Sequence, residues 1–465
     1  MKRYLLIILA LSIATHFAFF GYPPETVFDE VHFGKFVSGY FTGEYYFDIH
    51  PPLGKLIIAG MAKISGFEPG FSFETIGQEY QDNSYKWLRF LPKLAGSLLP
   101  AIAFLIALEL GISQKFAFLA GLLIVFENSL LVQSRLILLD SFLLLFGFLG
   151  ILFYLKFRKT DDLKPKTYPA IWLFLAGFFA ALAASIKWTG LGFLALMGIF
   201  YFINLLKSPV AEPRRLGSLR GTAEEKLKLA LKGLVFLIVI PFMIYFLIFA
   251  VHFTFLDKPG PGLAFHPPNF QEDNIFKKFV ELNTELYASN ARLTATHPYS
   301  SQWYEWPLMI RSVFYWQGDN ERIYLLGNPL IYWLSTVAVI YFLVNFFKNR
   351  KNFSYSSRFA SSESRILDFR LRKSGLLVIG YLLNLLPFIF IGRVMFLYHY
   401  FISLIFAVLI TAYSLDKLDF EHKKTAFNAI LAGSVVLFLF FSPLTYGFSI
   451  PEWYYKLLVW LPSWR

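Results

Sequence analysis

The sequence predicts an all-α polytopic membrane protein. Of its 465 residues, 56% are hydrophobic, 20% are aromatic and only 16% are charged. A soluble protein of this composition would expose too much apolar surface to water. Apolar segments of bilayer-spanning length also recur along the chain, since a hydrocarbon core of ~30 Å needs ~20 apolar residues per helix. We therefore expect one membrane domain that covers residues 1–465.

About eleven segments have the length and composition of transmembrane helices. The first follows Lys2 and Arg3 as a signal peptide would, but Gly21-Tyr22-Pro23-Pro24 offers no small-residue cleavage site. We expect this segment to be retained as a span. The expected spans lie at about 4–20, 88–109, 116–133, 137–155, 170–186, 190–206, 233–251, 328–347, 374–391, 395–413 and 425–441.

Basic residues in alternate connecting segments predict the orientation of these spans. They gather at Lys156–Lys159, from Arg214 to Lys232 and from Lys348 to Lys373. Such segments stay on the cytoplasmic side, so the N-terminus is expected in the cytoplasm and the C-terminus outside. These segments account for much of the net charge of +12. Their natural neighbours are anionic lipid headgroups of the bilayer, so we expect no nucleic-acid partner.

Several classes of chemistry are disfavoured by what the sequence lacks. The chain has no cysteine, which excludes disulfides, thiol catalysis and zinc-thiolate sites. It carries no P-loop, no dinucleotide glycine fingerprint and no HExxH motif. An ATP-driven pump is therefore disfavoured.

Two long segments, 21–86 and 252–326, are expected on the external side, and both are rich in Trp, Tyr, His, Asp and Glu. Loops of this length usually carry function. In the first loop, apolar residues recur at helical spacing from Phe33 to Tyr40, which predicts an amphipathic helix. The rigid His50-Pro51-Pro52 break is followed by a second expected amphipathic helix from Leu53 to Ile64.

Asp29 and Glu30 stand in the first turn of the first of these helices. One interpretation is that they complement the positive end of the helix, which is worth ~0.3–1 kcal/mol. The other is that neighbouring carboxylates in a partly desolvated cleft raise at least one pKa toward values useful to a general base. The residues alone leave both interpretations open.

Blocks along nearly the whole chain resemble the protein O-mannosyltransferase family. They are "FDEVHFGKF" and "FDIHPPLGKL" in the first loop, then "NSLLVQSRLILLD", "SIKWTGL", "HPYSSQWYEWPLMIR", "LLGNP", "LPFIFIGRVMFLYHY" and "WLPSW". The resemblance implies a GT-C glycosyltransferase fold with about eleven spans and amphipathic helices in the external loops. Eukaryotic members insert a soluble β-trefoil (MIR) domain in the second external loop, whereas only about 75 residues separate the flanking spans here. The compact form resembles prokaryotic members, which implies a multi-pass protein of the plasma membrane.

The resemblance also implies the reaction, which is transfer of mannose from polyprenyl-phosphate or dolichyl-phosphate mannose to Ser or Thr of secreted or membrane proteins. Configuration at the sugar is expected to invert, with Asp29 as the base and Glu30 orienting the acceptor or supporting Asp29. A dimer is also implied, since eukaryotic relatives work as dimers.

Cationic and hydrogen-bonding residues are expected to hold the donor phosphate, because an arginine near the hydrocarbon edge is costly unless it pairs with an anion. Arg89 is the first choice by resemblance, and a structural pair with Asp140 is the rival interpretation for Arg135. The rival interpretation for both Lys187 and Trp306 is that they anchor the protein at the membrane interface. The expected phosphate ligands are Arg89, Arg135, Arg393, His399 and Tyr400, and the further expected donor or acceptor contacts are His50, Lys55, Asp140, Lys187, Trp306 and Arg311.

No cofactor is expected, because arginines can neutralise a monophosphate unaided. The alternative is a divalent ion held by Asp29, Glu30 and His32. Two other functions stay open: a transporter with charges along a substrate path, and a GT-C transferase that acts on a glycolipid or polysaccharide. The transporter explains poorly why polar residues gather in the loops while the helices show few charges at mid-span.

Overall fold

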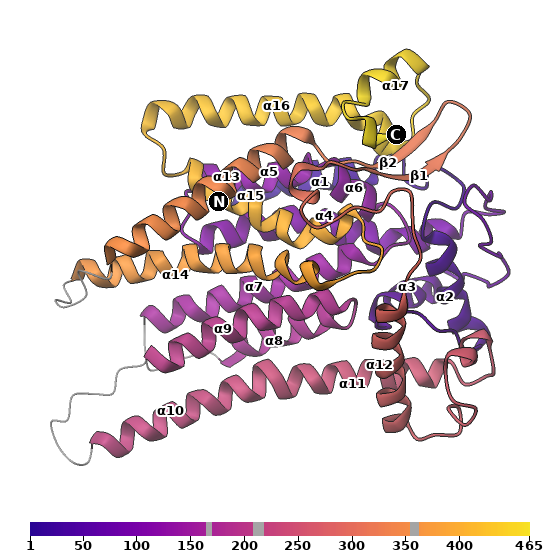
Figure 1. The fold of residues 1–465 in the computed structure, drawn as a ribbon, viewed down its shortest axis with the longest axis horizontal. Helices are drawn as coiled ribbons and strands as arrows, with labels where there is room; N and C mark the ends of the chain where they lie inside the picture. Colours follow the sequence, from indigo (N-terminus) through magenta and orange to yellow (C-terminus); the bar gives the residue numbers. More distant parts are fainter. Residues whose placement is uncertain (164–169, 208–217, 354–361) are drawn as a thin grey trace.

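The computed structural model describes residues 1–163, 170–207, 218–353 and 362–465. Arg214, which contributed to the predicted orientation, lies outside the described residues. The described chain is mostly helical, as predicted (Figure 1). The helices are α1 (Lys2–Phe17), α2 (Glu30–Thr42), α3 (Leu53–Ile64), α4 (Tyr85–Glu109), α5 (Gln114–Val125), α6 (Asn128–Ser134), α7 (Asp140–Leu163), α8 (Ala170–Ala184), α9 (Leu191–Lys207), α10 (Ser218–Leu234), α11 (Ile240–Phe255), α12 (Ile275–Arg292), α13 (Pro329–Phe353), α14 (Ser362–Leu383), α15 (Phe401–Leu415), α16 (Phe420–Tyr446) and α17 (Glu452–Leu458).

Within the described residues, strands β1 (Val313–Gln317) and β2 (Arg322–Leu325) form one antiparallel hairpin. In Figure 1 the long helices form a bundle, and α2, α3, α12, the hairpin and α17 gather at one end of it. The C-terminus lies at that end as well. We call it the loop end of the bundle.

Seven helical segments of the described chain are long and apolar enough to cross a membrane, or eight if a bent pair counts as one span. The expected count of eleven is therefore not confirmed. The expected span at 116–133 is broken into α5 and α6, which are bent by 57°. Helix α8 and the apolar part of α13 are shorter than a full span, and α1 has only 16 residues. The full-length segments are Tyr85–Glu109, Asp140–Arg158, Trp188–Leu206, Lys226–Phe255, Lys373–Phe390, Leu397–Leu415 and Glu421–Tyr446.

The break between α5 and α6 is held by Glu127, a carboxylate with no exposed surface. Its side chain caps α6 by accepting a hydrogen bond from the Leu130 amide at 2.7 Å, and it accepts another from the Asn328 amide at 2.9 Å. A buried carboxylate is tolerated when hydrogen bonds satisfy it in this way. The "NSLL" and "LLGNP" blocks therefore form a structural joint that fixes the direction of α6 toward the loop end.

The two long loops lie together at the loop end. Helix α2 ends at Gly43, whose φ of +81° is favourable for glycine. The Gly43 carbonyl accepts from the Lys258 amide at 3.0 Å, and the Tyr40 hydroxyl bonds to His252 Nδ1 at 2.8 Å. Helix α3 occupies the range that its sequence predicted. Segments about two hundred residues apart thus build one structure at this end.

Candidate active site

Asp29 precedes α2 in a strained turn. Phe28 has a φ of +47°, in the left-handed region that a residue with a large side chain rarely adopts, and such strain is common at functional sites. The Phe28 ring stacks on Tyr315 of β1, with centroids 4.1 Å apart. The Asp29 side chain makes no capping hydrogen bond to α2. The Asp29 side chain therefore does not cap the α2 backbone, while the interpretation that its charge complements the positive end of the helix stays a prediction; the residue is half-buried at the loop end.

Burial raises the pKa of Asp29 from 3.8 to about 7. The charge of Lys187 opposes this rise, whereas the carboxylates of Asp140 and Asp48 add to it. A carboxyl group with a pKa near neutrality is present in both its protonated and its deprotonated form at physiological pH, as suits a group that accepts and releases a proton. Lys187, Asp140 and Asp48 come from separate elements of the fold, so their combined effect on Asp29 shows which segments meet at the site.

Lys187 and Asp140 form an ion pair at 2.8 Å beside Asp29. Asp140 begins α7 and also accepts a hydrogen bond from Gln133 Nε2 at 2.6 Å. The Tyr315 hydroxyl donates to Gln133 Oε1 at 2.5 Å, which links this pair back to the ring stacked on Phe28. The expected pair between Arg135 and Asp140 is not formed, because Lys187 takes that place. Lys187 is thus a cation of the site, rather than only an interfacial anchor.

His50 and Lys55 lie on or next to the segment that leads into α3, close to Asp48, whose charge acts on Asp29. Lys55 is almost fully buried and pairs with Asp48, and it also donates to the His50 carbonyl at 2.9 Å. The pKa of His50 is well below its usual value because of burial, with further lowering by the charges of Lys187 and Lys55. His50 is therefore a neutral imidazole among cations.

Arg393 and His399 come from the connection between α14 and α15. Both contribute to the electrostatic field at His50, so they lie near the same centre. Arg393 is partly exposed, and none of the hydrogen bonds or ion pairs found within the described ranges involves it. His399 stacks on Trp306, with centroids 5.8 Å apart, and Trp306 donates to Ser301 Oγ at 3.0 Å. Trp306 is fully buried and packs against the His399 ring. It is therefore not part of an aromatic belt at the membrane surface.

The Glu30 carboxylate is enclosed by partners within the protein, contrary to the expected role in orienting the acceptor, whereas the alternative role of supporting Asp29 stays a prediction. It has no exposed surface. Its two oxygens accept from the amides of Val27 and Ile137, both at 2.9 Å, and from the Tyr80 hydroxyl at 3.3 Å. They also accept from Arg89 at 2.7 and 2.6 Å. A carboxylate enclosed in this way reaches no substrate.

Arg89 is the partner of Glu30 and is also fully buried. Its remaining N–H groups donate to the carbonyls of Gly21, Pro23 and Glu25 at 2.7 to 2.9 Å. Every N–H of the guanidinium is therefore used inside the protein. This arrangement contradicts the expected contact between Arg89 and a donor phosphate, and it shows Arg89 as the residue that fastens the first loop to α4.

Three other expected ligands also lie in different surroundings. Arg135 donates weakly to the carbonyls of Phe19 and Tyr22 and lies 4.3 Å from the Tyr446 ring. Tyr400 is fully buried and its hydroxyl bonds to that of Tyr381 at 3.3 Å. Arg311 donates to the Pro298 carbonyl at 2.5 Å. None of the three appears among the charges that act on Asp29 or His50.

Asp48, Gln133, Tyr315 and Tyr398 belong to the site but were not singled out from the sequence. Tyr398 lies under Lys187, whose Nζ is 5.2 Å from its ring centroid. Asp48, Gln133 and Tyr398 fall inside the blocks that carry the family resemblance, so those blocks were the available signal. Tyr315 lies outside them, and only the pairing of β1 beside Phe28 reveals it.

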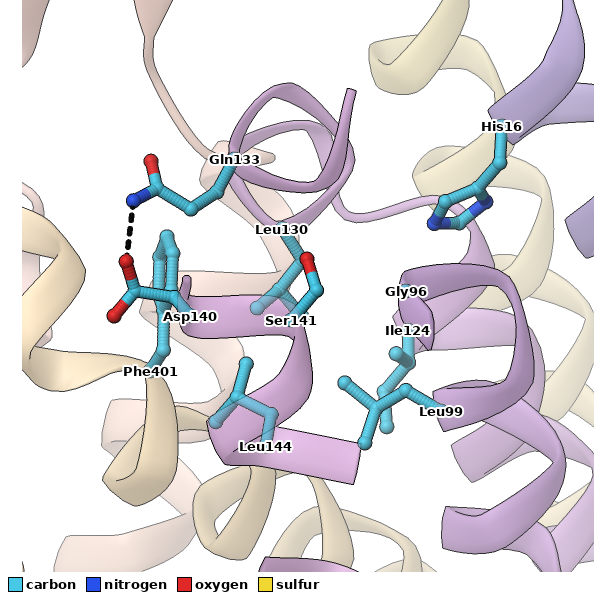
Figure 2. A pocket seen from close by; sticks show the side chains of 10 residues that line it. All are labelled: His16, Gly96, Leu99, Ile124, Leu130, Gln133, Asp140, Ser141, Leu144 and Phe401. Atoms are coloured by element: carbon cyan, nitrogen blue, oxygen red, sulfur yellow. Dashed lines mark hydrogen bonds between the residues drawn. The ribbon is translucent and has the colours of Figure 1, made fainter. Parts of the chain in front are cut away.

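A small cavity lies inside the bundle, next to Asp140 and Gln133 of the site (Figure 2). Asp140 and Gln133 line one side of it and His16 lines the other, while most of the remaining wall is apolar. Asp29 and Lys187 do not line it. Among the described residues, no three His, Asp or Glu side chains are grouped as metal ligands, and Glu30 of the considered trio is already bound to Arg89.

Family models match most of the chain. Residues 6–256 match the model described as dolichyl-phosphate-mannose-protein mannosyltransferase, and residues 275–464 match the C-terminal four-transmembrane region of protein O-mannosyltransferase. Protein O-mannosyl-transferase 2 of Danio rerio is 31% identical over 312 residues, which cover 65% of this chain and 40% of the relative. Dolichyl-phosphate-mannose–protein mannosyltransferase 4 of Schizosaccharomyces pombe is 36% identical over 276 residues, which cover 58% of this chain and 34% of the relative.

Solved structures show the same fold. The Pmt1–Pmt2 complex of S. cerevisiae bound to its sugar donor matches with a TM-score of 0.90 at 18% identity, over 100% of this chain and 92% of the other. ArnT of Cupriavidus metallidurans bound to undecaprenyl phosphate matches with a TM-score of 0.53 at 14% identity, over 94% and 64% of the two chains. The expected GT-C fold is thereby confirmed.

Proposed function

The chain belongs to the protein O-mannosyltransferase family, and from this we propose that it transfers mannose from polyprenyl-phosphate or dolichyl-phosphate mannose to Ser or Thr hydroxyls of secreted or membrane proteins. The observation that carries the proposal is the Asp29 carboxyl group, whose pKa burial raises to about 7 and on which the charges of the Lys187–Asp140 ion pair act. A base and a cation in one partly exposed place meet the two main needs of glycosyl transfer from a lipid phosphate.

In the proposed mechanism, Asp29 accepts the proton of the acceptor hydroxyl while its oxygen attacks the anomeric carbon of mannose. The bond between that carbon and the phosphate oxygen breaks, and the phosphate leaves on the lipid with its electron pair. A single displacement of this kind inverts the configuration, by analogy with inverting glycosidases, which also use one carboxylate as base. Lys187, Arg393 and His399 stabilise the departing phosphate. Lys187 has the capacity to do so while paired with Asp140, because an ammonium has several donors.

The direct test is an assay of detergent-purified protein with radiolabelled polyprenyl-phosphate mannose and Ser/Thr peptides. We expect label in the peptide fraction, and retention of activity in EDTA because the proposed chemistry needs no metal. Label in a glycolipid fraction instead would favour the alternative acceptor. A protein that transfers no mannose to either fraction would contradict the proposal.

The rate of transfer is expected to depend on the protonation of Asp29. A base is active only when deprotonated, and the Asp29 pKa is about 7. We therefore expect kcat/KM to rise with pH, about tenfold per unit, and to level off above about pH 7. An unshifted carboxyl, with a pKa of about 4, would give a plateau that already begins near pH 5. A flat profile between about pH 5 and pH 8, measured where the protein stays folded, would contradict the assignment of Asp29.

We also propose that the loop end faces the outside of a prokaryotic plasma membrane, with the N-terminus in the cytoplasm and a dimer as the working form. The absence of cysteine allows a simple test. Ser72 is exposed in the first loop, and Ser218 begins α10 within the basic segment from Arg214 to Lys232. An impermeant maleimide applied to intact cells should label Ser72→Cys, and it should label Ser218→Cys only after the cells are opened. Labelling of Ser218→Cys in intact cells would reverse the orientation.

A further inference from the structure

Helix α12 crosses the loop end and carries two asparagines that bond to the surroundings of the site. Asn283 and Asn290 are seven residues apart, so they lie on the same face, about 10 Å apart along the helix axis. That face also buries Phe279, Leu282 and Leu286. Figure 1 shows α12 running across the ends of neighbouring helices rather than along them.

Asn283 is connected to the turn that carries Lys187. Its Oδ1 accepts a hydrogen bond from the Tyr245 hydroxyl at 2.7 Å, and this same hydroxyl accepts from Trp188 Nε1 at 2.9 Å. Trp188 directly follows Lys187 in a short 3₁₀ turn between α8 and α9. The relay therefore fixes the residue next to the cation that pairs with Asp140.

Asn290 is connected to the Asp48–His50 segment. Its Nδ2 donates to the Ile49 carbonyl at 3.2 Å. Ile49 lies between Asp48 and His50, both of which belong to the electrostatic surroundings of the site. The two segments also touch each other, since the Leu53 amide donates to the Ser185 carbonyl at 3.1 Å.

We infer that α12 is a brace that sets the distance between the Lys187 turn and the Asp48–His50 segment, with Asn283 and Asn290 as positioning residues for the transfer reaction. The inference rests on the proposed function. Neither asparagine reaches Asp29, so both act through the residues they hold. Displacement of reacting groups by about 1 Å can cost ~10²-fold in rate, so two anchors on one rigid helix are an effective means of keeping the geometry.

The two asparagines act with opposite hydrogen-bonding roles, which gives a sharp test. Toward the site, Asn283 is an acceptor and Asn290 is a donor. An aspartate has nearly the same shape but only accepts when ionised. Asn283→Asp is therefore expected to keep the contact to Tyr245, whereas Asn290→Asp is expected to lose the contact to Ile49.

Mannosyl transfer by the full-length protein should be measured for Asn283→Ala, Asn283→Asp, Asn290→Ala and Asn290→Asp, with Thr284→Ala on the exposed side of α12 as the control. We expect Asn283→Ala to raise the KM for the lipid donor roughly tenfold through the Lys187 turn, and Asn283→Asp to restore it. Both Asn290 variants should lower kcat roughly tenfold with little change in the donor KM. Thr284→Ala should match the parent protein.

Melting temperatures of the same preparations separate positioning from folding. The positioning role of α12 is contradicted if both aspartate variants show the same change in KM and kcat, or if all four variants match Thr284→Ala. Neither result would affect the transfer activity of the parent protein. A uniform loss of rate that follows the melting temperature would show a merely structural helix and would also overturn the inference. Absence of transfer by the parent protein would instead refute the proposed function.

Discussion

Asp29→Asn is expected to leave the protein folded and to lower turnover by about 10²–10⁴-fold, the usual contribution of a positioned base. The substitution preserves the size of the side chain but removes the oxygen that accepts the proton. Since the Asp29 side chain makes no capping bond to α2, its loss should not weaken the helix. Turnover at saturating donor and peptide should be measured together with the melting temperature of the same detergent-purified protein.

Glu74→Gln is the matched control for this experiment, because Glu74 is an exposed carboxylate of the same loop. It should match the parent protein in both measurements. If Asp29→Asn turns over at the normal rate, Asp29 is not the base. If Asp29→Asn melts well below the parent, the carboxylate has a structural role that its contacts do not indicate.

Glu30→Gln and Arg89→Gln are expected to act on stability, by about 3–5 kcal/mol each, because each leaves a buried charge without its partner. Both side chains have no exposed surface, and they are joined by two hydrogen bonds of 2.7 and 2.6 Å. The double substitution should cost less than the sum of the single ones, since neither charge then remains. Denaturant or thermal unfolding in detergent measures all three variants.

Activity per folded molecule separates this expectation from a catalytic role. Molecules of Glu30→Gln that remain folded should keep much of the parental rate. A Glu30→Gln protein that melts like the parent but transfers no mannose would restore Glu30 to the catalytic site. Additive losses in the double variant would show that the two residues do not act as a pair.

The neighbours Asp29 and Glu30 illustrate how much of the site can be predicted from the sequence. The family resemblance implied that both carboxylates take part in the reaction, but successive residues of a helix point in different directions. Glu30 binds Arg89, which is 59 positions away in the chain, while the pKa of Asp29 responds to the charges of Lys187 and Asp140. The two roles thus depend on partners that no local pattern identifies.

The sequence by itself determined the helical membrane class, the bounds of α3 and the two loops that build the loop end, because hydrophobic periodicity, span length and proline breaks act within a few residues. It also predicted Asp29, Lys187 and Asp140 as site residues through composition and family resemblance, and the structure places the Lys187–Asp140 ion pair in the electrostatic surroundings of Asp29. Only the tertiary structure decided that Arg89 fastens the first loop, that Lys187 rather than Arg135 pairs with Asp140, and that α5 and α6 are bent by 57°. The physical reason is that a buried charge must find a partner, and which partner it finds is set by the packing of distant segments.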